Sequence, residues 1–220
     1  MRTVIVSGGS IDDAFACDFL KKLQTEGGVR TIAADHGLEF FYRNRLLPDC
    51  IVGDFDSTDP AIVTYYRDLG TVPIHAFRPE KDMTDTDIAV KRALADGADE
   101  ILFLGTTGTR LDHVLSNIYN LSLLAAQGIR ACMVDAHNRI TVPAGKTYAI
   151  AKEAQFGTYV SFLALGGPVE GITLKGFKYP VTDGRIVCGD GGLFVSNEIT
   201  AEEGQISWSS GNLIVIESRD

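Results

Sequence analysis

The stretch EILFLGTTGTRLDH at residues 100–113 decides the fold. Its first five residues read as a strand with four apolar residues in a row, Gly105 and Gly108 mark a turn, and helically spaced apolar residues continue from 111 to 127. The same order of strand, turn and helix recurs along the chain, with strand-like runs at 3–6, 29–33, 50–52, 71–75 and 129–134 and helical patterns at 12–23 and after residues 59 and 84. This alternation predicts an α/β domain with a mostly parallel, Rossmann-like sheet.

The character of the sequence changes near residue 138. No convincing helical pattern follows, and short β-type runs occupy residues 159–165, 193–196, 205–208 and 213–216. Turn-forming clusters separate these runs, among them Gly166-Gly167-Pro168. We therefore expect two domains, an α/β domain over residues 1–138 and a small all-β sandwich or barrel over residues 139–220.

Composition and charge exclude several classes of protein. With 220 residues, 45% hydrophobic and 22% charged, the chain has the makeup of a packed globular protein. Its net charge of −9 argues against nucleic acid or an anionic membrane as the main partner, since both require a basic surface. The sequence contains no signal-like segment and no apolar run of membrane-spanning length, so we expect a cytoplasmic protein. Four isolated cysteines indicate neither a zinc site nor a disulfide framework.

Carboxylates follow several of the predicted strands. Asp54 and Asp56 lie one residue apart after the apolar run at 50–52, and such neighbours project to the same side of a strand. Two carboxylates that converge need a cation between them, and Mg²⁺ fits best because it prefers oxygen ligands. The alternative for each residue is to cap backbone amides. Asp85 and Asp112 at two further strand ends weaken that alternative, because ligands of such sheets gather beyond the carboxyl ends of the strands.

Candidates for binding a polyphosphate surround the same sheet edge. Arg110 offers a planar guanidinium fork and Lys81 a mobile point charge. Gly105 and Gly108 would let backbone amides approach phosphate oxygens, which the N-terminus of the helix near residue 111 also favours. The alternative for the glycines is a plain turn between strand and helix.

Further polar residues lie near these candidates. His113 and Asn117 are four residues apart on one face of that helix and are predicted to reach the crevice, His113 as a binding or supporting residue. Asp35 follows the second strand and is a candidate nucleotide or substrate contact, with a helix N-cap as the alternative. Gly8-Gly9 does not complete a dinucleotide-binding motif, and a tight connection is preferred there to a phosphate-facing turn.

Taken together, these segments resemble the thiamine pyrophosphokinase family, and the resemblance covers nearly the whole chain. It implies an N-terminal α/β catalytic domain and a C-terminal β-sandwich that helps to bind thiamine. The matching segments are Asp35-His36-Gly37, Gly53-Asp54-Phe55-Asp56-Ser57, Glu80 to Asp87, Gly105 to Asn117, Leu174 to Pro180 and Ser196-Asn197-Glu198.

The resemblance implies an enzyme that moves the terminal pyrophosphoryl group of ATP onto the hydroxyl of thiamine, giving thiamine diphosphate and AMP. Asp56, Asp112 or solvent would accept the hydroxyl proton, and the sequence does not choose among them. The implied site contains Asp54, Asp56 and Asp85 around Mg²⁺ with Asp112 nearby, and Lys81, Thr84 and Arg110 on the ATP phosphates.

The resemblance also implies a homodimer, with the thiamine pocket where the β-domain of one subunit meets the catalytic domain of its partner. Ser196 and Asn197 would then contact thiamine, with a strand-end turn as the alternative. Two positions depart from the family pattern. Thr109 replaces a glycine before the arginine, and His36 replaces a glycine after the early aspartate, which affects the backbone approach to phosphate and the contacts near Asp35.

Two rival interpretations remain. Residues 54–58 also fit the Asp-x-Asp-x-Thr motif of haloacid-dehalogenase-type phosphatases, in which Asp54 would be a nucleophile. That class needs a late acidic pair after another α/β strand, whereas this chain turns to β structure. The second rival is a non-enzymatic nucleotide or vitamin sensor. A pure sensor has little need for several metal-ligating carboxylates.

Overall fold

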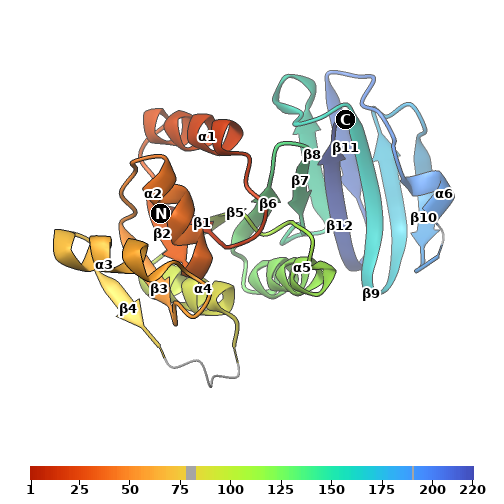
Figure 1. Ribbon diagram of the computed structural model, residues 1–220. Coiled ribbons are helices and arrows are strands. Elements are labelled where there is room, and N and C mark those ends of the chain that lie inside the picture. The colour runs from red at the N-terminus through yellow and green to blue at the C-terminus, as the bar shows by residue number, and fades with distance from the viewer. Residues whose placement is uncertain (78–82, 190) are drawn as a thin grey trace. The chain divides into compact units, whose positions relative to one another are not determined.

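The computed structural model describes residues 1–77, 83–189 and 191–220, so the predicted ATP contact Lys81 lies outside the described residues. The chain forms two compact units, one of Met1–Asn120 with Met133–Ala136 and the other of Leu121–Cys132 with His137–Asp220 (Figure 1). Residues 121–132 group with the second unit, and the division into 1–138 and 139–220 stays a prediction. Among the described residues no helix has the length and apolar character needed to cross a membrane.

The first unit alternates strands and helices. Its strands β4, β3, β2, β1 and β5 are neighbours in that order, and each adjacent pair is parallel. The elements of this part of the chain are β1 (Arg2–Val6), α1 (Asp13–Thr25), β2 (Arg30–Ala34), the short 3-10 helix η1 (Asp35–Gly37), α2 (Leu38–Arg43), β3 (Cys50–Gly53), α3 (Pro60–Leu69), β4 (Ile74–Ala76), α4 (Asp85–Ala95), β5 (Glu100–Leu104), α5 (Leu111–Ala126) and β6 (Arg130–Val134).

Local sequence explains where these helices begin. The Asp12 carboxylate accepts a hydrogen bond from the Phe15 amide at 2.9 Å and caps α1. Asp59 caps α3 in the same way, and Pro60 occupies the first turn, where its missing N–H costs nothing. These side chains satisfy amides that a helix N-terminus otherwise leaves without a partner. The helix starts expected after residues 12, 59 and 84 are therefore confirmed.

Strand register brings the loops after β1, β2, β3 and β5 to one edge of the parallel sheet. Val6 pairs with Ala33 on one side and with Leu104 on the other, and Ala34 pairs with Val52. The strands are buried because helices cover such sheets, and Val4, Ile5 and Val6 are fully inaccessible to solvent. The residues that follow each strand are therefore neighbours in space although they are far apart in sequence.

The second unit is built from antiparallel strands. In the order β7, β12, β9, β11 and β8, neighbouring strands pair antiparallel, and β10 pairs with β9. Its buried core includes Trp208, Phe162 and Phe177, so the tryptophan packs in the interior. The elements are β7 (Asn138–Thr141), β8 (Thr147–Ala151), η2 (Lys152–Ala154), β9 (Tyr159–Lys175), β10 (Val181–Ile186), α6 (Gly191–Phe194), β11 (Glu203–Ser207) and β12 (Ser210–Ser218).

The structure corrects two local expectations and adds one helix. Gly166-Gly167-Pro168 does not end a strand but lies inside the long β9, where Gly166 has φ +75° and the register with β12 shifts. A glycine tolerates that conformation, so the strand bends and continues. Residues 193–196 do not form a strand, because the short helix α6 occupies 191–194. The helix α2 was not predicted.

Candidate active site

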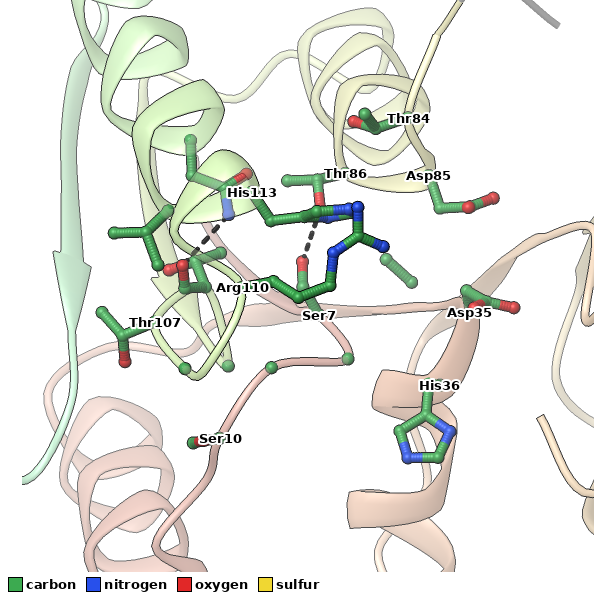
Figure 2. Close-up of a pocket in the computed structure, with 18 of the residues that line it drawn as sticks. Ser7, Ser10, Asp35, His36, Thr84, Asp85, Thr86, Thr107, Arg110 and His113 are labelled. Atoms are coloured by element: carbon green, nitrogen blue, oxygen red, sulfur yellow. Dashed lines mark hydrogen bonds between the residues drawn. The ribbon is translucent and has the colours of Figure 1, made fainter. Parts of the chain in front are cut away.

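A pocket of about 540 Å³ lies in the first unit at the carboxyl edge of the parallel strands (Figure 2). Figure 2 shows Asp35 and Asp85 on one side of this pocket and Ser10 and Thr107 on the other. Eight of the predicted site residues line it, namely Asp35, Thr84, Asp85, Gly105, Gly108, Arg110, His113 and Asn117. The loops after β1, β2 and β5 and the first turns of α4 and α5 thus form a single pocket.

Asp54 and Asp56 lie beside the pocket in a cluster of three carboxylates. One oxygen of each of Asp35, Asp54 and Asp56 lies within 4.8 Å of the others. The Asp56 amide donates a hydrogen bond to Asp54 Oδ1 at 3.2 Å, and Phe55 between them has φ +62°. This turn brings the two acidic side chains together. The third member of the cluster is Asp35, the predicted ATP contact, whereas Asp85 lines the adjacent pocket.

The carboxylates of this cluster repel one another, and the pKa of Asp56 reflects that repulsion. The pKa of Asp56 is raised above its ordinary value, first because of the Asp54 carboxylate and also because of Asp35 and Asp85. A cation placed among these oxygens would relieve that repulsion, and three carboxylates form the hard oxygen donor set that Mg²⁺ prefers. The residues present therefore fit a divalent metal ion.

Asp35 is held in place by the same loop that carries the acidic pair. Its carboxylate accepts hydrogen bonds from the hydroxyl of Ser57 and, at 3.3 Å, from that of Thr58. Gly53 makes the close approach possible, because a Cβ there would lie 3.0 Å from the Asp35 Cα. Asp35 thus orients the loop after β3 as well as lining the pocket.

Backbone contacts join the loops after β1 and β5 at the pocket floor. The Gly9 amide donates to the Gly105 carbonyl at 2.7 Å, and the Ser10 amide donates to the Thr107 carbonyl at 2.7 Å. A Cβ on Gly9 would lie 2.3 Å from the Thr107 carbonyl oxygen. Gly105 adopts φ +65°, which favours glycine. The glycines therefore have a role beyond a plain turn, because they bring two backbone segments into contact at the pocket.

Arg110 and Asp112 form an ion pair at the start of α5. The Arg110 Nη2 to Asp112 Oδ2 distance is 2.6 Å, and both side chains are exposed. Hydrogen bonding from Arg110 lowers the pKa of Asp112. Asp112 lines a smaller neighbouring cavity of about 200 Å³ together with Thr84 and His113. The pair therefore presents the guanidinium at the pocket while keeping the Asp112 carboxylate ionised.

The first turns of α4 and α5 also face the pocket. Asn117 is buried, and its Nδ2 donates to the Thr106 carbonyl at 3.1 Å, which fixes the loop after β5. His113 lies one turn earlier on α5 and lines both cavities. The N-termini of two helices carry partial positive charge, which favours an anionic ligand at this place.

Ser196 and Asn197 lie in the second unit. Asn197 is fully buried, and its side-chain oxygen accepts from the Tyr179 and Glu198 amides while its nitrogen donates to the Tyr179 carbonyl. Ser196 has φ +57° and is exposed. These contacts give Asn197 a role in holding a turn, and thiamine contact by either residue stays a prediction.

Several pocket residues were missed from the sequence. They follow β1, lie beside Asp35, or belong to α4, and their contacts are with residues distant in the chain. His36 Nδ1 lies 3.2 Å from the Ser57 carbonyl, so the departure from glycine adds a polar ring to the pocket wall. Gly8-Gly9 after an apolar strand is the local signal that points to this part of the pocket. The missed residues include Ser7, Gly8, Gly9, Ser10, His36, Ser57 and Thr86.

Comparison with known proteins gives a consistent result. The family model described as thiamin pyrophosphokinase, catalytic domain matches residues 23–133, and that described as thiamin pyrophosphokinase, vitamin B1 binding domain matches residues 147–213. Thiamine pyrophosphokinase of Bacillus subtilis is 33% identical over 192 residues, covering 86% of this chain and 87% of that protein.

Solved structures agree with the sequence matches. The crystal structure of thiamine pyrophosphokinase from Bacillus subtilis has a TM-score of 0.87 at 30% identity and covers both chains completely. That of thiamin pyrophosphokinase from Geobacillus thermodenitrificans has a TM-score of 0.83 at 31% identity, covering 100% of this chain and 98% of that one. The chain belongs to the thiamine pyrophosphokinase family.

Proposed function

We propose that this protein transfers the pyrophosphoryl group of ATP to the hydroxyl of thiamine, giving thiamine diphosphate and AMP. The observation that carries the proposal is the cluster of Asp35, Asp54 and Asp56 beside a pocket lined by glycines and Arg110, in a chain of this family. The cluster supplies metal ligands, and the pocket has room for a nucleotide triphosphate, with Arg110 and two helix N-termini available to its phosphates.

Asp54 and Asp56 are proposed to hold Mg²⁺, with Asp85 completing the protein's share of the ligands and Asp35 orienting the loop. When bound, Mg²⁺ neutralises charge on the ATP phosphates and on the transferring group. The predicted ATP contacts that line the pocket, together with Lys81, are proposed to hold the phosphates. Their task is to keep the thiamine hydroxyl and the β-phosphorus in line.

The proton acceptor is proposed to be Asp56 or solvent. Asp112 suits that role poorly, because its hydrogen bond to Arg110 lowers its pKa and so favours the ionised, unprotonated form. Its proposed part is to orient Arg110 toward the phosphates.

The finer architecture and the assembly are proposed together. The first half of β9 pairs with β12 and the second half with β10 and β11, with the bend at Gly166 between them. Strands that change sheets at such bends are typical of sandwiches, which supports a β-sandwich in addition to a Rossmann-like domain.

We propose a cytoplasmic homodimer in which Ser196 of one subunit contacts thiamine at the catalytic unit of its partner.

Product analysis tests the function. The purified protein is incubated with ATP, Mg²⁺ and thiamine, and we expect AMP and thiamine diphosphate in equal amounts. A haloacid-dehalogenase-type phosphatase would release inorganic phosphate without AMP and would form an acyl-phosphate on Asp54. A sensor would form neither product. Either of these results would refute the proposed reaction.

Arg110→Lys is expected to raise the KM for ATP by roughly tenfold, because lysine keeps the charge but loses the planar two-nitrogen contact. Arg185→Lys is the matched control, since Arg185 also forms an exposed ion pair with a carboxylate, Glu170, at 2.8 Å but lies in β10 of the other unit. Steady-state kinetics with varied ATP gives the comparison. Equal KM values in the two variants would contradict phosphate binding by Arg110.

Leu115→Glu is expected to convert the proposed dimer to monomers. Leu111, Leu115 and Tyr119 are spaced four residues apart on α5 and are 71%, 53% and 56% exposed, an apolar stripe that a partner would cover. Leu47→Glu is the control, because Leu47 is 58% exposed but lies outside this helix. Sedimentation equilibrium measures the mass. A wild-type monomer, or dissociation of both variants alike, would contradict this interface.

A further inference from the structure

The first turn of α4 carries two pocket residues and is capped by its own sequence. Thr84 Oγ1 accepts from the Asp87 amide at 3.2 Å, and Asp87 Oδ2 accepts from the Thr84 amide at 2.9 Å. Such a reciprocal capping box satisfies two helix amides and stiffens the turn. It does not by itself fix the turn relative to the rest of the pocket, because both partners move with the helix.

A second contact ties this cap to α5. Asp87 Oδ1 accepts a hydrogen bond from Asn120 Nδ2 at 2.7 Å. The Asp87 carboxylate therefore uses one oxygen within its own helix and the other on a neighbouring helix. Because α5 also carries His113 and Asn117, the contact couples the first turn of α4 to the helix that forms another wall of the pocket.

A third contact comes from the end of β1. Ser7 Oγ and Thr86 Oγ1 lie 2.9 Å apart, and both residues are buried, with 5% and 9% exposure (Figure 2). A buried hydroxyl that loses a hydrogen-bond partner carries a desolvation penalty, so this pair resists separation. Asp85 lies between the two anchored residues Thr84 and Thr86, and in Figure 2 its side chain lies on the same side of the pocket as Asp35.

We propose that Ser7, Asp87 and Asn120 are positioning residues that clamp the first turn of α4 and thereby set the place of Asp85 and Thr84 in the pocket. The proposal rests on the proposed function of Asp85 as a metal ligand. None of the three needs to touch the reacting atoms. A shift of the order of 1 Å in such a group is enough to slow a reaction roughly a hundredfold, so the clamp controls turnover through geometry.

Exchanging the side chains of the hydrogen-bonded pair Asp87 and Asn120 tests the clamp. Asn120→Asp replaces the donor by a carboxylate that repels Asp87, and it is expected to lower kcat by roughly tenfold or more. The double variant Asp87→Asn/Asn120→Asp restores a donor and an acceptor with their places exchanged, and Oδ1 of the new amide can still cap Thr84. We expect it to recover most of the wild-type kcat.

Substitutions of Thr86 test its contact with Ser7 at the end of β1. Thr86→Val removes the hydroxyl and keeps the volume, whereas Thr86→Ser keeps the hydroxyl and loses a methyl group. Thr31→Val is the control, because Thr31 is equally buried and hydrogen-bonded to Asp49 at the opposite end of the strands. We expect kcat to fall more for Thr86→Val than for Thr86→Ser and to stay at the wild-type value for Thr31→Val, although all three substitutions lower thermal stability.

Two readouts that do not depend on turnover accompany the kinetics. Amide hydrogen exchange at residues 84–88 should be faster in Asn120→Asp and Thr86→Val than in the wild type and should return to the wild-type rate in the double variant. The affinity for ATP in the presence of Mn²⁺, measured by calorimetry, should fall in the same two single variants and recover in the double variant. Unchanged exchange and affinity in Asn120→Asp, or a double variant that regains stability without regaining either, would overturn the clamp. A wild-type protein that binds ATP but makes no thiamine diphosphate would instead refute the proposed function.

Discussion

Asp54→Asn is expected to lower kcat on the order of a thousandfold while leaving the fold intact. The substitution removes one negative charge from the cluster and weakens the metal site. Asparagine keeps a side-chain oxygen that can accept the hydrogen bond from the Asp56 amide, so the turn at Phe55 should be retained. Because Asp54 is the main cause of the raised pKa of Asp56, its removal should lower that pKa toward the ordinary value and should not destabilise the metal-free protein.

Asp59→Asn is the matched control for this variant. Asp59 follows the same loop and caps α3 through the Ala61 amide, a role that asparagine fills equally well. Its substitution removes a charge of the same sign without entering the cluster. Product formation, thermal unfolding and carboxyl NMR titration give the three measurements. Wild-type turnover in Asp54→Asn, or equal losses in both variants, would refute the metal assignment.

Gly9→Ala is expected to weaken ATP binding by at least roughly tenfold and to destabilise the first unit by about 1–3 kcal/mol. The new Cβ would lie 2.3 Å from the Thr107 oxygen and 2.5 Å from the Gly105 oxygen, and both are backbone atoms that cannot rotate away. The loops after β1 and β5 must therefore separate, which breaks the Gly9 to Gly105 hydrogen bond at the pocket floor.

Gly167→Ala serves as the control, because a Cβ at that position meets nothing within 4 Å and the backbone has no positive φ. Titration calorimetry with ATP measures the effect on binding, and urea-induced unfolding measures the effect on stability. If Gly9→Ala binds ATP as the wild type does, then the two loops do not form the floor of the nucleotide site.

The parallel part of the fold could be predicted because its strands and helices alternate strongly. A buried parallel strand reads as a short apolar run, and the helix caps at Asp59 and Thr84 are local signals. The strands of the second unit were harder to predict from the sequence. Glycine and proline at 166–168 indicate a turn by local chemistry, but pairing of β9 on both sides carries the strand through a bend at Gly166.

The sequence predicts Asp54, Asp56, Asp85 and Asp112 at one sheet edge, whereas the structure gathers Asp35, Asp54 and Asp56 into one cluster and places Asp85 and Asp112 in two neighbouring cavities. That Asp54 and Asp56 converge follows from one loop, whereas the place of Asp35 depends on the pairing of β2 with β3. The contact between Ser7 and Thr86 joins residues 79 positions apart and has no local signal. Such long-range contacts depend on tertiary packing, which spacing along the chain does not report.

The most direct test of the account is a crystal of the protein grown with Mn²⁺ and a non-hydrolysable ATP analogue, with the metal located by anomalous scattering. We expect one peak coordinated by oxygens of Asp54 and Asp56 and by phosphate oxygens of the nucleotide. A metal ion bound elsewhere, or nucleotide phosphates remote from these carboxylates, would contradict the proposed catalytic site.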